Sequence, residues 1–167
     1  MATKTDFSST EWEVLRDAPH LVVLAVAAAG SSGIFGSIAE AIAPSGPIIE
    51  ALKGSNQLLK EVCEKEEIMA SIKSIKSLEK ASSDFANIQS ALRKEATDKS
   101  RAALDLLRQK GSPEDIAAYR DFLIKLGDKV ANAAKEGGFL GFGGERVSEH
   151  ERTLLAELAE AVGALQA

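Results

Sequence analysis

Residues 112–134 read SPEDIAAYRDFLIKLGDKVANAA, and this stretch decides the fold class. Ser112 followed by Pro113 is typical of a helix start, because serine caps the first turn and proline suits the first helical position. Apolar residues then return at alternating spacings of three and four, the period of a helix packed against neighbours. They are Ile116, Tyr119, Leu123, Leu126, Val130 and Ala133. The pattern predicts a long helix with one buried face.

A second helix start is visible near the beginning of the chain. Ser8 and Glu11 are spaced as a capping box, in which each side chain bonds the backbone N–H of the other residue. Phe7 and Trp12 stand where a hydrophobic staple belongs. The sequence therefore predicts a helix that begins beside Ser8.

Proline interrupts the pattern of this first helix. Pro19 lacks a backbone donor and is expected to kink or divide the helix, which would place His20 at the start of the second half. Residues 20–30, HLVVLAVAAAG, are apolar all round and predict a helix surrounded by others.

The rest of the chain also reads as helices joined by short breaks. Short helices are expected at 34–43 and 48–53, and one charged helix is expected to run from Leu58 to about residue 80. Asp84 is a candidate cap for the following helix. Ser148, with a glutamate three residues on, is a candidate cap for the last helix. We expect an all-α, bundle-like or orthogonal single domain over residues 1–167, with about six to eight helices.

Composition excludes several classes of protein. Hydrophobic residues make up 45% and charged residues 27% of the chain, as in a globular domain. The net charge of −5 argues against a dedicated nucleic-acid binder. The apolar run 21–29 is shorter than the roughly 20 residues of a membrane span. A single cysteine, Cys63, and a polar beginning without a signal-peptide pattern predict a cytoplasmic protein.

Two segments resemble each other. Residues 24–36 read LAVAAAGSSGIFG, and residues 130–143 read VANAAKEGGFLGFG. Each is an alanine-rich helix pattern that runs into a glycine-rich loop. This likeness predicts a weak duplication of a helix–Gly-loop–helix unit.

The C-terminal part of the chain resembles the TerB-like family, small all-helical bacterial proteins associated with tellurite and general stress resistance. The motifs are AAKEGG at 133–138 and VSEHERTLLAELAEAVG at 147–163. Residues 25–43 resemble the first copy of the family's repeat more loosely. The resemblance implies an all-helical fold and a role in a bacterial, tellurite-type stress response.

The resemblance also implies a candidate site for a divalent metal. Glu136 stands where the family has an aspartate before glycine, and Glu149 and Glu151 match its acidic cluster. This chain departs from the family in its Gly- and Phe-rich insertion between residues 137 and 147. The first copy has no carboxylate before Glu40. The alternative to a metal site is a structural role: Glu151 completes the capping box with Ser148, and the acidic residues stabilise the dipole of the last helix.

The insertion itself is a candidate partner-binding site. Five glycines at 137, 138, 141, 143 and 144 surround Phe139, Leu140 and Phe142. The loop lacks the GK[ST] ending of a phosphate-binding loop. Its apolar side chains either pack into the domain core or contact a partner protein or a membrane surface.

Catalytic patterns are absent from the sequence. His20, His150 and Cys63 are the only histidines and cysteine, so neither a zinc pattern nor a nucleophile–histidine arrangement can be assembled from motifs. We therefore predict a non-catalytic TerB-like interaction or scaffold protein. The alternatives are a metal-binding or metal-sensing protein that uses the acidic loop and, last, a hydrolase with an unrecognised site.

Overall fold

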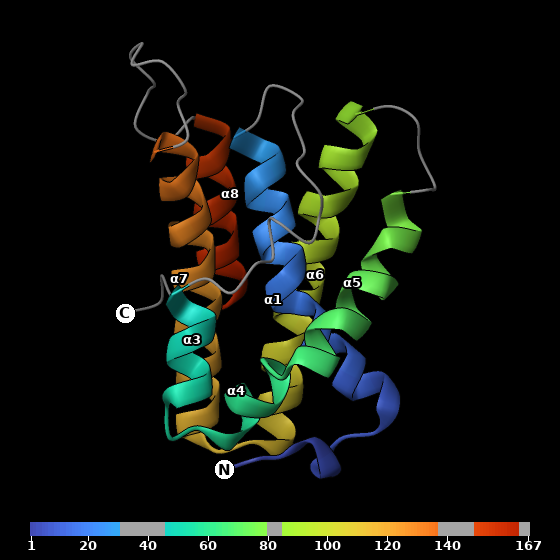
Figure 1. Ribbon diagram of the computed structural model, residues 1–167, viewed down its shortest axis with the longest axis vertical. Helices are drawn as coiled ribbons and strands as arrows, with labels where there is room; N and C mark the ends of the chain where they lie inside the picture. The colour runs from blue at the N-terminus through green and yellow to red at the C-terminus, as the bar shows by residue number, and fades with distance from the viewer. Residues whose placement is uncertain (31–45, 80–84, 137–148, 164–167) are drawn as a thin grey trace.

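The computed structural model describes residues 1–30, 46–79, 85–136 and 149–163, and every regular element in these ranges is helical (Figure 1). This confirms the predicted all-α class. In the described ranges, a short 3-10 turn, η1, precedes seven packed α-helices. Their bounds are η1 Lys4–Asp6, α1 Ser9–Gly30, α3 Gly46–Lys53, α4 Gln57–Val62, α5 Lys65–Glu79, α6 Phe85–Lys110, α7 Pro113–Glu136 and α8 Glu149–Ala161.

Helix α1 is the central element of the bundle. It packs against α5 and α6 on one side and against α7 and α8 on the other (Figure 1). Residues 21–26 are all buried, as the apolar stretch predicts. The short helices α3 and α4 pack against the first half of α7, at the end of the bundle where the α6–α7 turn lies (Figure 1).

The stripe on α7 faces the core as predicted. Tyr119, Leu123 and Leu126 are buried, while Ile116 and Val130 are half-buried against the same core. Gly127 lies on this helix where Leu155 of α8 packs closely, since a Cβ at that position would come within 2.8 Å of a Leu155 methyl. The glycine therefore lets α8 approach α7.

The helix starts follow the predicted caps. The Ser8 N–H donates to the Glu11 carboxylate at 2.8 Å, and the rings of Phe7 and Trp12 are 6.3 Å apart. Ser112 receives a hydrogen bond from the N–H of Asp115, three residues into α7.

Two predictions about helix breaks are wrong: the division of the first helix at Pro19, and one unbroken helix from Leu58 to about residue 80. Helix α1 runs continuously through Pro19, so His20 lies inside the helix instead of at a start. The stretch that begins near Leu58 is divided into α4 and α5, because Cys63 leaves the helical conformation with φ −90° and ψ 3°. The new helix restarts with the Ile68 N–H bonded to the Glu64 carbonyl.

Several predictions fall outside the described residues. They concern the helix at 34–43, the caps Asp84 and Ser148, and the glycine loops of the proposed duplication. Among the helices that the structure does describe, none combines the length and apolar character needed to cross a membrane.

Candidate functional site

The predicted acidic site is divided between the end of α7 and the first turn of α8. Glu136 is the last residue of α7, and its side chain lies outside the described residues. Glu149 is exposed, whereas Glu151 is buried, as expected for positions two residues apart on a helix. Within the described part of the chain, no three His, Cys, Asp or Glu side chains gather closely enough to hold a metal ion. The metal site stays a prediction.

A hollow of about 490 Å³ lies at this end of the bundle, between α1, α6 and α8. We call it the end hollow. Its volume falls within the range of about 300–1,000 Å³ that is common for ligand pockets. Three helices line the hollow with residues at helical spacing. Several of the lining side chains are small, alanine or serine, and so leave space between the helices. The lining residues are Ala25, Ala29, Ala86, Gln89, Ser90, Arg93, His150 and Leu154.

Two polar residues of the end hollow are already engaged. The Gln89 amide donates to the carbonyl of Ala28, one of the last four carbonyls of α1, which have no partner inside their own helix. Arg93 forms a two-pronged ion pair with Glu157 of α8, with Nε and Oε2 2.7 Å apart. This hydrogen bonding raises the pKa of Arg93 and lowers the pKa of Glu157. Both contacts hold neighbouring helices in place around the hollow.

The predicted partner-binding residues precede helix α8 in the sequence. Phe139, Leu140 and Phe142 belong to the segment that joins α7 to α8, and they are outside the described residues. His150 and Leu154, in the first two turns after that segment, line the end hollow.

Of the three histidine and cysteine residues, His20 and Cys63 are buried away from solvent, whereas His150 is exposed and lines the end hollow. Burial lowers the pKa of His20 to about 4, against a weaker opposing effect of its hydrogen bond to the Arg16 carbonyl. Burial raises the pKa of Cys63 to about 12. With a pKa of about 4, buried His20 is a weak base at pH 7, and Cys63 remains a thiol instead of the nucleophilic thiolate.

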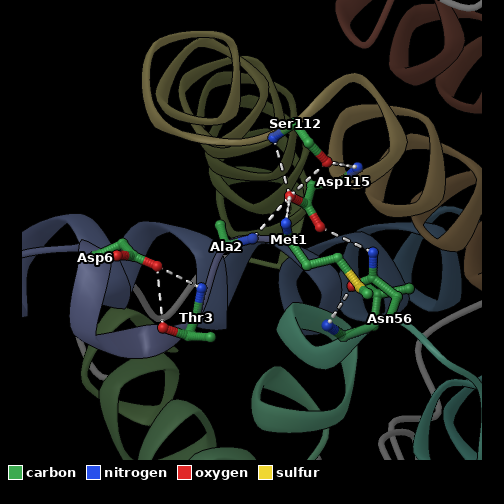
Figure 2. A network of polar contacts seen from close by, with 8 residues as sticks. Met1, Ala2, Thr3, Asp6, Asn56, Ser112 and Asp115 are labelled. Atoms are coloured by element: carbon green, nitrogen blue, oxygen red, sulfur yellow. Dashed lines mark hydrogen bonds and ion pairs between the residues drawn. The ribbon is translucent and has the colours of Figure 1, made fainter.

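The opposite end of the bundle holds a polar cluster that the sequence analysis missed (Figure 2). Asp115, in the first turn of α7, is fully buried. Its Oδ2 accepts hydrogen bonds from the N–H of Ala2 at 2.8 Å and from the N–H and hydroxyl of Ser112 at 3.0 and 2.9 Å. Its Oδ1 accepts from the Asn56 amide at 3.0 Å. The α-amino group of Met1 lies 3.9 Å from Oδ2 of Asp115.

These contacts keep Asp115 ionised. Burial acts to raise its pKa, but the hydrogen bonds from Ser112, Ala2 and Asn56 outweigh burial and hold the pKa below 3.8. The available sequence signal was the spacing of Ser112 and Asp115, which matches a capping box with aspartate in place of glutamate. The contacts with Ala2 and Asn56 join residues far apart in the sequence, so no local pattern predicts them.

Two further carboxylates hold the same N-terminal segment. Glu61 of α4 accepts the N–H of Lys4 at 2.6 Å. Glu67 of α5 pairs with the Lys4 ammonium and accepts the indole N–H of Trp12 at 2.9 Å. Burial acts to raise the pKa of Glu67, but the hydrogen bonds from Lys4 and Trp12 prevail and lower it. Residues 2–6 are thus fastened to three different helices.

Comparison with known proteins gives no relative: no protein-family model, no curated protein and no solved structure matches the chain.

Proposed function

We propose that the chain is a non-catalytic, TerB-like helical protein that binds a partner protein at the end of the bundle where α7 ends and α8 begins. The observation that carries this proposal is the end hollow of about 490 Å³ between α1, α6 and α8. The segment that contains Phe139 and Phe142 precedes α8 in the sequence, and the first turns of α8 line that hollow. Aromatic side chains are typical anchors of protein interfaces.

The chemistry of the buried residues supports a non-catalytic role. Burial makes His20 a weak base and keeps Cys63 in the thiol form. The hydroxyl of Tyr119 is fully buried and donates to a backbone carbonyl. In the described part of the chain, these groups contribute to packing and helix pairing.

Site-specific photo-crosslinking tests the proposal. Ser90 and Ala91 are both exposed neighbours on α6, but only Ser90 lines the end hollow. A photoreactive phenylalanine at position 90 should give a defined protein adduct in cells, and the same residue at position 91 should not. Ser90→Trp, which fills the hollow, should then weaken binding of the captured protein, with Ala91→Trp as the matched control. Equal adducts at both positions would count against the hollow as a binding site.

The cellular setting follows from the family resemblance alone. On that ground we propose that the protein acts in the bacterial cytoplasm, in a tellurite-type stress response. A strain that lacks the gene should become more sensitive to tellurite, and the wild-type gene should restore resistance. An unchanged tolerance would remove the stress assignment and leave the binding proposal standing.

Metal binding by Glu136, Glu149 and Glu151 is the second candidate function. The exposed carboxylate of Glu149 in the first turn of α8 supports it, and the burial of Glu151 on another side of the helix does not.

Contact of the Phe139–Phe142 loop with a membrane surface is the other form of the interaction hypothesis. Flotation with anionic vesicles distinguishes it from protein binding.

A further inference from the structure

The carboxylate of Asp115 is a buried charge whose direct hydrogen-bond partners are all neutral (Figure 2). They are the N–H of Ala2, the N–H and hydroxyl of Ser112, and the side-chain amide of Asn56. Among the residues that the structure describes, no lysine or arginine pairs with this carboxylate. Burial of an ionised group is costly when no opposite charge accompanies it. The site therefore has room for a counter-charge at hydrogen-bond distance.

The backbone nitrogen of Ala2 is the atom best placed to carry that counter-charge. It lies 2.8 Å from Oδ2 of Asp115, whereas the nitrogen of Met1 lies 3.9 Å from the same oxygen, beyond hydrogen-bond distance. Ala2 is only 5% exposed, and Met1 is 68% exposed. The protein thus holds residue 2 in place and leaves residue 1 mostly in solvent. A chain that began at Ala2 would keep this nitrogen where it is and give it a positive charge.

The peptide bond between Met1 and Ala2 is a suitable cleavage site. Methionine is removed from new chains in which glycine follows it, and alanine is the next smallest residue. An aminopeptidase adds one water across such a bond: the water oxygen joins the carbonyl carbon of Met1 as a carboxylate, and the nitrogen of Ala2 becomes an ammonium. Atoms and charges balance without another reactant. Because Ala2 is buried in the folded chain, the cut has to come before this segment folds.

We propose that Ala2 is the first residue of the mature protein and that its α-ammonium forms a buried ion pair with Asp115. The hydrogen bond between them then becomes charge-assisted, and such bonds are about twice as strong as neutral ones. Acetylation of Ala2 removes the charge but leaves an N–H donor, so an acetylated chain returns to the neutral contact. The ion pair lies at the other end of the bundle from the end hollow and is independent of the function proposed above.

Three forms of the full chain that differ only at this nitrogen test the ion pair. The first begins at Ala2 and is made by cutting a fusion protein directly before that residue. The second retains Met1, through expression with an inhibitor of the methionine aminopeptidase. The third begins at acetylated Ala2, through co-expression of an N-terminal acetyltransferase. Without any of these treatments, the intact mass of the protein purified from bacterial cytoplasm should show the loss of one methionine.

The form that begins at Ala2 should have the highest urea midpoint of the three near pH 7. Pairing with a carboxylate favours the charged ammonium, so its titration midpoint, followed by NMR of ¹⁵N-labelled Ala2, should lie roughly one pH unit or more above the usual value of about 8. The stability advantage is then fully present below about pH 8 and is lost as pH rises through the raised midpoint. Asp115→Asn should return the midpoint to about 8. Glu114→Gln, on an exposed neighbour in the same turn of α7, should leave it raised.

Three outcomes would overturn the proposal. Retention of Met1 in the purified protein would show that Ala2 is not the first residue. Equal urea midpoints of the three forms near pH 7 would show that the charge on the Ala2 nitrogen does not stabilise the fold. A titration midpoint of about 8 in the chain that begins at Ala2 would show that its ammonium does not pair with Asp115. This last measurement needs no substitution, so it decides the question even where Asp115→Asn fails to fold.

Discussion

The hydroxyl of Tyr119 on α7 donates a 2.6 Å hydrogen bond to the carbonyl oxygen of Leu15 on α1. In a regular helix this carbonyl would accept the N–H of residue 19, four positions later, but Pro19 has no N–H. Both Leu15 and Tyr119 are fully buried, so water does not replace the lost bond. A side chain from another helix thus satisfies the carbonyl that proline leaves open, and α1 continues.

Removing the hydroxyl should therefore cost stability. Tyr119→Phe leaves a buried carbonyl without its donor, which typically costs about 1–3 kcal/mol in the free energy of unfolding. Pro19→Ala supplies a backbone N–H to the same carbonyl, so Tyr119→Phe should cost less in that background. Denaturant unfolding of the wild type, both single variants and the double variant measures this coupling. Equal costs of Tyr119→Phe in the two backgrounds would show that the hydroxyl does not compensate for Pro19.

Local pattern predicted the helices well, because their signals lie within a few residues. The period of α7, the cap at Ser8 and the apolar stretch of α1 all depend on neighbours in the sequence. The breaks were harder to predict. The effect of Pro19 is offset by a residue 100 positions later, and the turn at Cys63 has no glycine or proline to mark it.

The site was predicted less completely than the fold. The sequence correctly places Glu149 and Glu151 in the first turn of a helix. It missed the role of Asp115, because that carboxylate bonds to Ala2, 113 positions away. It also gave no sign of the end hollow, which exists because alanines from two helices come together in space.

The core stripe of α7 gives a direct test of the packing. Leu123 is buried, and Leu123→Ala should lower the free energy of unfolding by about 2–5 kcal/mol through lost apolar burial and a residual cavity. Lys125→Ala, at an exposed position on the same helix, is the control and should change stability little. Urea unfolding monitored by circular dichroism measures both. An unchanged midpoint for Leu123→Ala would contradict the observed packing.

His20 should make stability depend on pH in mildly acidic solution. Burial lowers its pKa from 6.5 to about 4 in the folded chain. The unfolded chain therefore binds a proton as pH falls below 6.5, while the folded chain does not do so until about pH 4. Stability is fully present above pH 6.5 and should fall below it by up to about 1.4 kcal/mol per pH unit.

The two histidines of the chain provide matched variants for this measurement. His20→Gln should remove most of the decline in stability between pH 6.5 and 5, where aspartates and glutamates contribute little. His150→Gln changes an exposed residue and should keep the decline. If both variants retain the wild-type slope, another group takes up the proton.

The metal alternative has a simple calorimetric test. We expect no submicromolar binding of Ca²⁺ or Zn²⁺, because Glu149 and Glu151 lie on different sides of α8 and one of them is buried. Titration of the wild type and of Glu149→Gln would decide the question. A submicromolar site in the wild type that disappears in Glu149→Gln would establish the metal-binding function instead.

The last prediction concerns Phe139 and Phe142. Five glycines accompany these aromatic residues, although a helix connection needs only a few residues and one or two glycines. An aromatic anchor that is desolvated only in a complex contributes to binding and little to folding. We therefore expect Phe139→Ser, Phe142→Ser to change the melting temperature by only a few degrees while weakening association with the protein captured at position 90. Thermal melts of the isolated chain separate the two interpretations, and Ser90→Trp serves as a positive control for lost binding. A fall of many degrees in the double variant would mean that the loop is part of the core, and the interaction proposal would lose its aromatic anchors.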